Sequence, residues 1–337
     1  MSIGVILADD LTGALDTGAE LSALLDAVNA PILFVPAFPD MNRGMRGGVI
    51  YIDGLPVAES IFGKDPFNPV KHSRVEDILH ATAGSLPVAV HDVGGAPASP
   101  APGVHAMNAS TNEELRLIAE SAKQTGITVF AGCAGFARHL PYVWGLAAGE
   151  IRIPPLPQRL LVFSGSMNGI TTGQLQYGRS MGIPAYTIGG NALSDPAVFP
   201  YAEILRALGE GSVVIVEAVS SEEVPPVPAH APPIGEEARR AAAEGMGEIA
   251  ARLIRQARGC LPLVIGGDTL LSTMQNLRCQ RLYPLQSIAT GTVLALADTC
   301  LGQVPVVTKS GGLGPLNIME ILLSYIQTGK GGINDAP

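Results

Sequence analysis

The stretch Ile3-Gly4-Val5-Ile6-Leu7-Ala8-Asp9-Asp10-Leu11-Thr12-Gly13 near the start of the chain predicts the fold class. Residues 3–8 are apolar without alternation, which is typical of a strand buried on both faces of a parallel sheet. Leucines and a valine then recur at helical spacing between residues 21 and 28. The sequence therefore predicts an α/β fold in which an acidic loop comes directly after a strand, at the sheet edge where ligands bind.

This acidic loop has two interpretations. Asp9, Asp10 and Thr12, with Asp16 one turn into the helix, could bind a divalent cation, accept a proton from a hydroxyl or hold a polyol. Ordinary N-capping of the helix by Asp10 or Thr12 explains the same pattern. The pair of neighbouring carboxylates favours a functional role slightly, because a cap needs only one.

Composition limits the classes of protein to consider. The 337 residues suggest two domains, and 47% hydrophobic with 15% charged residues is typical of a folded chain with large cores. The formal net charge of −9 disfavours nucleic acid or an anionic membrane as a partner. A small anion remains compatible, because backbone N–H groups and a few basic side chains can hold one locally.

Cysteine usage and the N-terminus suggest a cytoplasmic protein. Cys133, Cys260, Cys279 and Cys300 are scattered and form no Cys-x-x-Cys pair, so we expect reduced thiols and no zinc. No basic segment followed by an apolar one opens the chain, so we expect neither a signal peptide nor a transmembrane helix.

Residues 151–158 contain three prolines and no periodicity, and we interpret them as a linker between domains 1–150 and 159–330. In the first domain, Arg43 lies in a glycine-rich segment, 37–48, where it could hold a carboxylate or phosphate. A solvated surface loop is the alternative for this segment. The small-residue turn at residues 131–137 predicts a helix packed close to a sheet edge.

Two local signals in the first domain predict where elements turn and start. Asp53-Gly54 between two apolar runs predicts a β-hairpin. Thr111 with Glu114 three residues later predicts a capping box at the start of a helix.

Three loops in the second domain come after predicted strands and are rich in Gly, Ser and Thr: residues 164–169, 266–269 and 309–314. Each alone could be only a tight turn. Together, at the ends of strands, they predict a phosphate-binding surface. With the acidic loop in the other domain, they suggest phosphoryl transfer across a cleft between the domains.

The order of these motifs resembles the four-carbon acid sugar kinases, the family of threonate, erythronate and 3-oxo-tetronate kinases. The resemblance rests on Asp9-Asp10-Leu11-Thr12-Gly13-Ala14, Ser164-Gly165-Ser166 with Thr171, Thr172 and Gln174, Gly266-Gly267-Asp268-Thr269, and Lys309-Ser310-Gly311-Gly312-Leu313-Gly314. It implies two domains, each with a mostly parallel sheet flanked by helices. It also implies that Mg²⁺-ATP phosphorylates a hydroxyl of a small sugar acid.

The resemblance also implies roles for individual residues. Asp9 or Asp10 would orient and deprotonate the attacking hydroxyl, while Thr12, Asp16 and Arg43 would bind the acid, with Arg43 on its carboxylate. The nucleotide would contact Ser164, Ser166, Gly266, Gly267, Asp268, Thr269, Thr290, Gly291, Thr292, Lys309, Gly311, Gly312 and Gly314. No residue is assigned to the metal, and a homodimer is compatible with the sequence but not required by it.

The chain departs from the family pattern in three places. A Lys-x-Asp-Ser-Thr-x-Arg-Gly motif expected after the acidic loop is absent, Asn108 stands where the family has Asp, and Cys133 replaces a serine. The lost motif should help to hold the acid, so a non-catalytic nucleotide-binding relative is the alternative to an active kinase. An unrelated dehydrogenase is disfavoured, because no Gly-x-Gly-x-x-Gly comes after the first strand.

Overall fold

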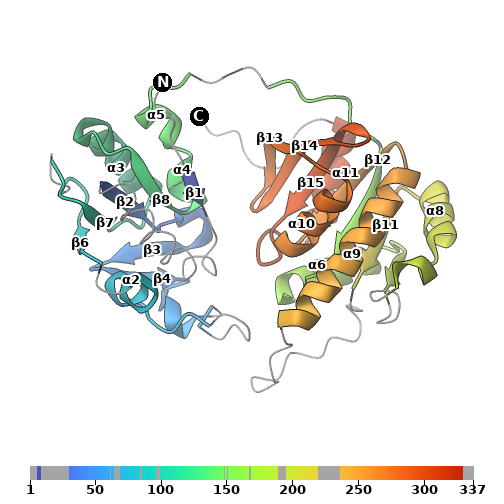
Figure 1. Ribbon diagram of the computed structural model, residues 1–337, viewed down its shortest axis with the longest axis horizontal. Coiled ribbons are helices and arrows are strands. Elements are labelled where there is room, and N and C mark those ends of the chain that lie inside the picture. The colour runs from blue at the N-terminus through green and yellow to red at the C-terminus, as the bar shows by residue number, and fades with distance from the viewer. Residues whose placement is uncertain are drawn as a thin grey trace. The chain divides into compact units, whose positions relative to one another are not determined.

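The computed structural model describes residues 6–8, 30–60, 62–63, 69–83, 86–95, 99–147, 149, 151–166, 168–188, 195–218 and 236–328. The chain divides into two compact units, one formed by residues up to 149 and the other mainly by residues from 150 onward (Figure 1). The predicted first helix and the residues Asp9, Asp10, Thr12 and Asp16 lie outside the described residues.

The first unit contains a parallel sheet of order β1-β8-β2-β7-β6. Its strands are β1 (Ile6–Ala8), β2 (Pro31–Val35), β6 (Val88–His91), β7 (Gly103–Met107) and β8 (Val129–Gly132). A small antiparallel sheet joins β3 (Arg43–Arg46), β4 (Val49–Ile52) and β5 (Leu55–Pro56). The helices are α2 (Val75–Ala83), α3 (Asn112–Thr125), α4 (Ala134–Ala137) and α5 (Leu140–Val143), with short 3-10 turns η1 (Pro39–Met41) and η2 (Val57–Glu59).

Strand β2 is buried on both faces, as its continuous apolar run predicts. Ile32 and Phe34 pack in one cluster with α2 and the small sheet, and Leu33 and Val35 pack in another with α3 and α4. Helix α3 begins at the expected capping box, in which Thr111 accepts from the Glu114 backbone N–H and Glu114 accepts from the Thr111 N–H. The chemistry of local sequence thus determines where this covering helix starts.

The segment 37–48, for which a solvated surface loop was one interpretation, contains strand β3, and Arg43 at its start is buried. The surface-loop interpretation is therefore wrong. Gly47 and Gly48, both with positive φ, turn the chain into β4, and Asp53 and Gly54, also with positive φ, form the next predicted turn. Both turns match the backbone twist that antiparallel hairpins require.

The second unit contains a seven-stranded sheet of order β10-β11-β9-β12-β15-β14-β13. Its strands are β9 (Arg159–Ser164), β10 (Ala185–Thr187), β11 (Val213–Glu217), β12 (Cys260–Ile265), β13 (Arg281–Ala289), β14 (Thr292–Thr299) and β15 (Gly302–Lys309). The helices are α6 (Gly169–Ser180), α8 (Tyr201–Glu210), α9 (Glu236–Gln256), α10 (Gly267–Asn276) and α11 (Ile318–Thr328), and η3 spans Pro196–Val198.

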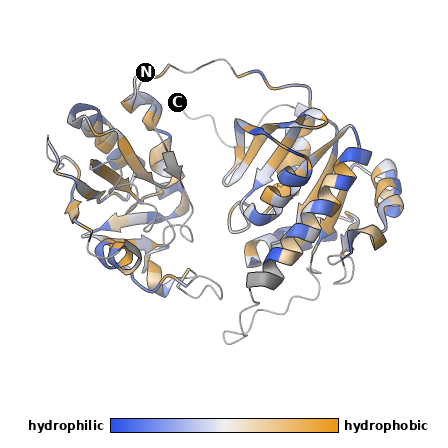
Figure 2. Ribbon diagram, in the orientation of Figure 1, coloured by the Kyte–Doolittle hydropathy of each residue, from blue (hydrophilic) through white to orange (hydrophobic). Residues whose placement is uncertain are grey.

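Helices cover both faces of this sheet. Leu161, Phe163 and their neighbours pack with α8, α9 and α10, whereas Leu160 and Val162 pack with α6 and α11 on the opposite face. Figure 2 shows the apolar strands inside and a hydrophilic outer surface on α9. This arrangement confirms the predicted α/β fold with mostly parallel sheets.

One part of the second unit departs from the parallel pattern. Strands β13 and β14 form an antiparallel hairpin, and β14 pairs antiparallel with β15. No strands were expected between residues 280 and 300, although Thr290, Gly291 and Thr292 were expected to contact the nucleotide. The hairpin brings these three residues to the end of β15.

Gly132 is required by the close approach of β8 to β2. A Cβ on Gly132 would lie 2.2 Å from the Val35 carbonyl oxygen, so Gly132→Ala must push two core strands apart. We expect a loss of about 3 kcal/mol in the free energy of unfolding, measured in urea. Gly126→Ala is the matched control, since Gly126 has positive φ but open space around it, and about 1 kcal/mol is expected there. Equal losses in the two variants would contradict this explanation.

Candidate functional site

The seven-stranded sheet has a switch point between β9 and β12. The chain leaves β9 toward β10 and β11 on one side, and leaves β12 toward β13 on the other. Ser164, Ile265 and Lys309 are register partners across β9, β12 and β15, and Thr292 of β14 pairs with Lys309. The loops after β9, β12 and β15 and the turn before β14 therefore lie side by side, at the place where open α/β sheets bind ligands.

Glycines allow these loops to touch. A Cβ on Gly165 would lie 2.2 Å from the Thr269 Oγ1, and one on Gly311 would lie 2.5 Å from the Ser166 Oγ. The Gly266 N–H donates to the Lys309 carbonyl over 2.9 Å. The loops after β9, β12 and β15 thus form one continuous surface.

The β13–β14 turn joins the same surface. The Ser310 N–H donates to the Gly291 carbonyl over 2.9 Å. Gly291 has positive φ, and a Cβ there would lie 2.6 Å from the Leu313 Cβ. Each of the thirteen predicted nucleotide residues thus lies on one of these four loops or at the adjoining end of a strand or of α10: Ser164, Ser166, Gly266, Gly267, Asp268, Thr269, Thr290, Gly291, Thr292, Lys309, Gly311, Gly312 and Gly314.

Helix α6 holds the loop after β15 through two buried side chains. The Thr171 Oγ1 donates to the Gly311 carbonyl over 2.6 Å. The Gln174 Nε2 lies within hydrogen-bond distance of the Gly314 and Pro315 carbonyls, at 3.0 and 2.9 Å. Neither side chain is exposed to solvent. The sequence alone did not indicate a function for Thr171 or Gln174, because their partners lie about 140 residues away.

The surface offers hydrogen-bond donors and one positive charge. The hydroxyls of Ser164 and Thr292 are buried and have no hydrogen-bond partner in the described part of the chain. The Lys309 side chain is only 3% exposed, and its Nζ donates to the Ser310 carbonyl over 2.7 Å. Burial lowers the pKa of this ammonium to about 8.

The amino end of α10 adds further donors. Its N-cap is Gly266, and no side chain of the described residues caps the helix there. The first backbone N–H groups of this ten-residue helix are therefore available to a ligand, and its dipole favours an anion. Hydroxyls, free N–H groups and a buried ammonium together fit the phosphates of a nucleotide.

Glu217 is a functional candidate that the sequence analysis missed. It ends β11 beside Ser164 and is 1% exposed, and its carboxylate forms an ion pair with Arg179 and accepts from the Thr187 hydroxyl. The sequence could have identified Glu217, because a carboxylate that directly follows four apolar residues lies at the end of a buried strand.

Arg43 occupies the carboxyl edge of the first sheet. Its side chain is 7% exposed, its Nη1 donates to the Cys133 Sγ over 2.8 Å, and its guanidinium carbon lies 5.9 Å from the centre of the Phe62 ring. Its Nε has no hydrogen-bond partner, and no carboxylate forms an ion pair with it, within the described residues. A buried guanidinium in this state fits a planar anion such as a carboxylate.

Two polar side chains, Asp40 and Asn108, hold the segments around Arg43. The Asp40 carboxylate accepts from the Asn112 amide over 2.7 Å and from Arg138 over 2.6 Å. The Asn112 hydrogen bond and the Arg138 charge lower the pKa of Asp40. Asn108 receives a hydrogen bond from the Gly48 N–H at its amide oxygen, while its amide nitrogen donates to Asp92 over 2.8 Å.

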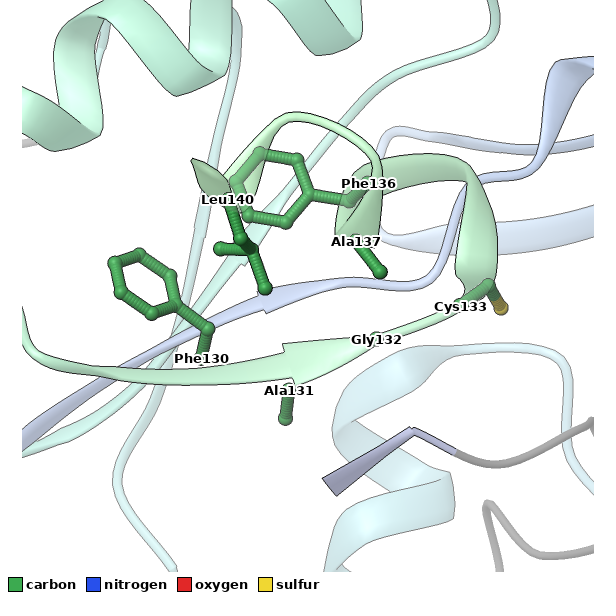
Figure 3. A pocket seen from close by; sticks show the side chains of 7 residues that line it. All are labelled: Phe130, Ala131, Gly132, Cys133, Phe136, Ala137 and Leu140. Carbon is green, nitrogen blue, oxygen red and sulfur yellow. The ribbon is translucent and has the colours of Figure 1, made fainter. Parts of the chain in front are cut away.

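A small apolar pocket lies behind this edge (Figure 3). Its lining comes from the end of β8 and from the next two helices along the chain: Phe130, Ala131, Gly132, Cys133, Phe136, Ala137 and Leu140. It carries no charged side chain and belongs to the packing of α4 against the sheet.

In the part of the chain that the structure describes, no helix combines the length and the apolar character of a membrane span, and no three metal-ligating side chains form a cluster. All four cysteines fall in this part of the chain, and none forms a disulfide.

Both halves of the chain match known domain families. Residues 16–140 match a sugar-binding N-terminal domain, and residues 161–319 match a nucleotide-binding C-terminal domain. A D-erythronate kinase from Heliobacterium modesticaldum is 26% identical over 92% of this chain and 76% of its own length. A D-threonate kinase from Bordetella bronchiseptica is 25% identical over 92% and 74%, respectively.

Solved structures share the fold. The Haemophilus influenzae protein HI1011 gives a TM-score of 0.62 at 19% identity, over 96% of this chain and 81% of that one. A chain from Salmonella typhimurium LT2 gives 0.63 at 19% identity, over 94% and 77%. With its two matched domains in the expected order, the chain belongs to the four-carbon acid sugar kinase family.

Proposed function

We propose that the protein transfers the terminal phosphoryl group of ATP to a hydroxyl of threonate, erythronate or 3-oxo-tetronate. The observation that carries this proposal is the surface around Lys309. There a buried ammonium, two hydroxyls without a partner among the described residues and the N–H groups at the start of α10 meet. Residues 159–330 would bind the nucleotide and residues 1–150 the acid, with 151–158 as the linker. The cleft between them remains a prediction.

The phosphates of ATP fit the loops of the second domain. Lys309 and the N–H groups at the start of α10 would neutralise the oxygens, and Ser164 and Thr292 would donate to them. Asp268 lies exposed on the same edge and offers a carboxylate to Mg²⁺, which proteins commonly hold through one or two carboxylates and the phosphates themselves. Mg²⁺ would supply charge neutralisation when bound.

The acid carboxylate fits Arg43, whose guanidinium can bind it through two parallel hydrogen bonds. Thr12 and Asp16 would bind the hydroxyls of the acid. Asp9 or Asp10 would accept the proton of the attacking hydroxyl as its oxygen bonds to phosphorus and the bond to the ADP oxygen breaks. These four residues lie outside the described residues, so their roles rest on the motif.

ADP release tests the proposal directly. Purified protein with Mg²⁺-ATP should release ADP in the presence of one of D- or L-threonate, D- or L-erythronate or a 3-oxo-tetronate, with longer aldonates as controls. We expect Asp10→Asn to lower kcat by at least about 10²-fold if Asp10 is the base. Unchanged turnover in that variant would exclude Asp10 as the base.

If no acid of the panel causes ADP release, ATP binding distinguishes a non-catalytic relative from a protein without the proposed function. ATP binding without turnover, seen as a rise in the melting temperature, would identify a non-catalytic relative that has lost its acceptor site with the missing motif. No binding and no turnover would overturn the proposed function altogether.

The buried ammonium of Lys309 should make nucleotide binding depend on pH. Because its pKa is about 8 in the free protein, it is charged at pH 7 and mostly neutral at pH 9. The terminal phosphate of ATP stays ionised over this range, because the second ionisation of a phosphate monoester has a pKa of about 6. We therefore expect the Kd for ATP, measured by calorimetry, to rise through this window as the ammonium is lost.

Lys309→Met should weaken ATP binding about tenfold at pH 7 and remove this pH dependence. Lys123→Met, at an exposed position on α3, is the control and should retain it. A wild-type affinity that stays constant from pH 7 to 9 would contradict a direct role for Lys309.

Gln174→Glu tests the contacts that hold the loop after β15. The substitution keeps the shape of the side chain but turns its donor into an acceptor facing the Gly314 and Pro315 carbonyls. We expect the Kd for ATP to increase at least about tenfold, because the buried contacts become repulsive. Gln176→Glu makes the same charge change at an exposed position of α6 and should bind ATP normally. Equal affinities would show that the loop does not depend on Gln174.

A further inference from the structure

Cys133 is fixed at the junction between β8 and α4 (Figure 3). The Cys133 N–H donates to the Val35 carbonyl over 3.3 Å. The preceding residue, Gly132, lies close to the same carbonyl, so the backbone at Cys133 is packed against the end of β2. The residue is 8% exposed. The thiol therefore has a defined place between the ends of β8 and β2.

Among the described residues, the Cys133 thiol hydrogen-bonds to Pro36 and to Arg43. It donates to the Pro36 carbonyl over 3.1 Å, and its sulfur accepts from the Arg43 Nη1 over 2.8 Å. Donation to Pro36 turns the S–H away from Arg43 and presents a sulfur lone pair to the guanidinium. The three groups form a chain from Arg43 through Cys133 to the backbone of the segment after β2.

The guanidinium of Arg43 depends on this chain for its orientation. Among the described residues, Cys133 accepts the hydrogen bond that Arg43 donates through its side chain, while Nε is buried without a partner. The Phe62 ring, 5.9 Å away, supplies a face but no directed hydrogen bond. Removing the sulfur would leave the planar group free to rotate about its last bonds.

We propose that Cys133 is a positioning residue that orients the Arg43 guanidinium toward the carboxylate of the acid substrate. This inference rests on the proposed function, in which Arg43 binds that carboxylate. It extends that function to a residue that acts through Arg43. The hydrogen bond from Arg43 requires an acceptor at position 133, and the orientation of that acceptor requires a donor to Pro36.

Serine can replace both functions of the thiol, whereas alanine can replace neither. We expect Cys133→Ala to raise the KM for the acid about tenfold, the effect of one hydrogen bond to a charged group, with kcat and the KM for ATP within about twofold. Cys133→Ser should restore the KM for the acid to within about threefold. Cys300→Ala removes an exposed cysteine and is the control.

A double-mutant cycle distinguishes positioning from a general structural effect. Arg43→Lys alone should raise the KM for the acid, because an ammonium cannot bind a carboxylate through two parallel bonds. Adding Cys133→Ala to it should have little further effect. An unchanged KM in Cys133→Ala, additive effects in the cycle, or an equal loss in kcat and both KM values would overturn the proposal.

Failure of the proposed function gives a different result. If the wild-type protein turns over no acid of the panel, that function fails, and crystal structures of the wild-type protein and Cys133→Ala decide the inference. A guanidinium that bonds to Sγ in the first and is displaced in the second would show that Cys133 positions Arg43. The same guanidinium position in both would show that it does not.

Discussion

Each unit buries a positive charge at the carboxyl edge of its parallel sheet, and the surrounding loops are built to hold it. Arg43 is 7% exposed and Lys309 is 3% exposed. Transfer of an ion from water to such a site costs several kcal/mol unless an opposite charge compensates it. In the described part of the chain each cation is held by a neutral acceptor instead, the Cys133 sulfur and the Ser310 carbonyl. Both positions are therefore suited to an anion that the described residues do not supply there.

Close backbone contact is what makes these positions rigid. Gly165 and Gly311 bring neighbouring loops within contact of Thr269 and Ser166, and Gly132 brings β8 against β2. A side chain at any of these glycines would separate the groups that meet there. Gln174 adds hydrogen bonds to the loop after β15, so that loop and α6 form one unit. Because the loops hold one another, the charged groups need not reorganise when an anion binds.

Local chemistry made part of this structure predictable. The strand-loop-helix units, the Thr111–Glu114 capping box and the Asp53-Gly54 turn depend on neighbours in sequence, and all were expected. The burial of Arg43 was not predicted, because Cys133 lies 90 residues away and the turn at Gly47 and Gly48 resembled an open loop. The family motif identified the loops of the second unit, but the contacts that hold them were not readable, since they join segments far apart in the chain.

Asn108 and Cys133 depart from the family pattern, and the structure shows that both side chains form hydrogen bonds. Asn108 donates from its amide to the Asp92 carboxylate, a contact in which an ionised aspartate would face a second negative charge. It also accepts from the Gly48 N–H, beside the turn that leads out of β3. Cys133 supplies one donor and one acceptor, as a serine would. The hydrogen bonds of Cys133 and Asn108 hold the segments around Arg43 in place, as the proposed binding of an acid carboxylate by this guanidinium requires.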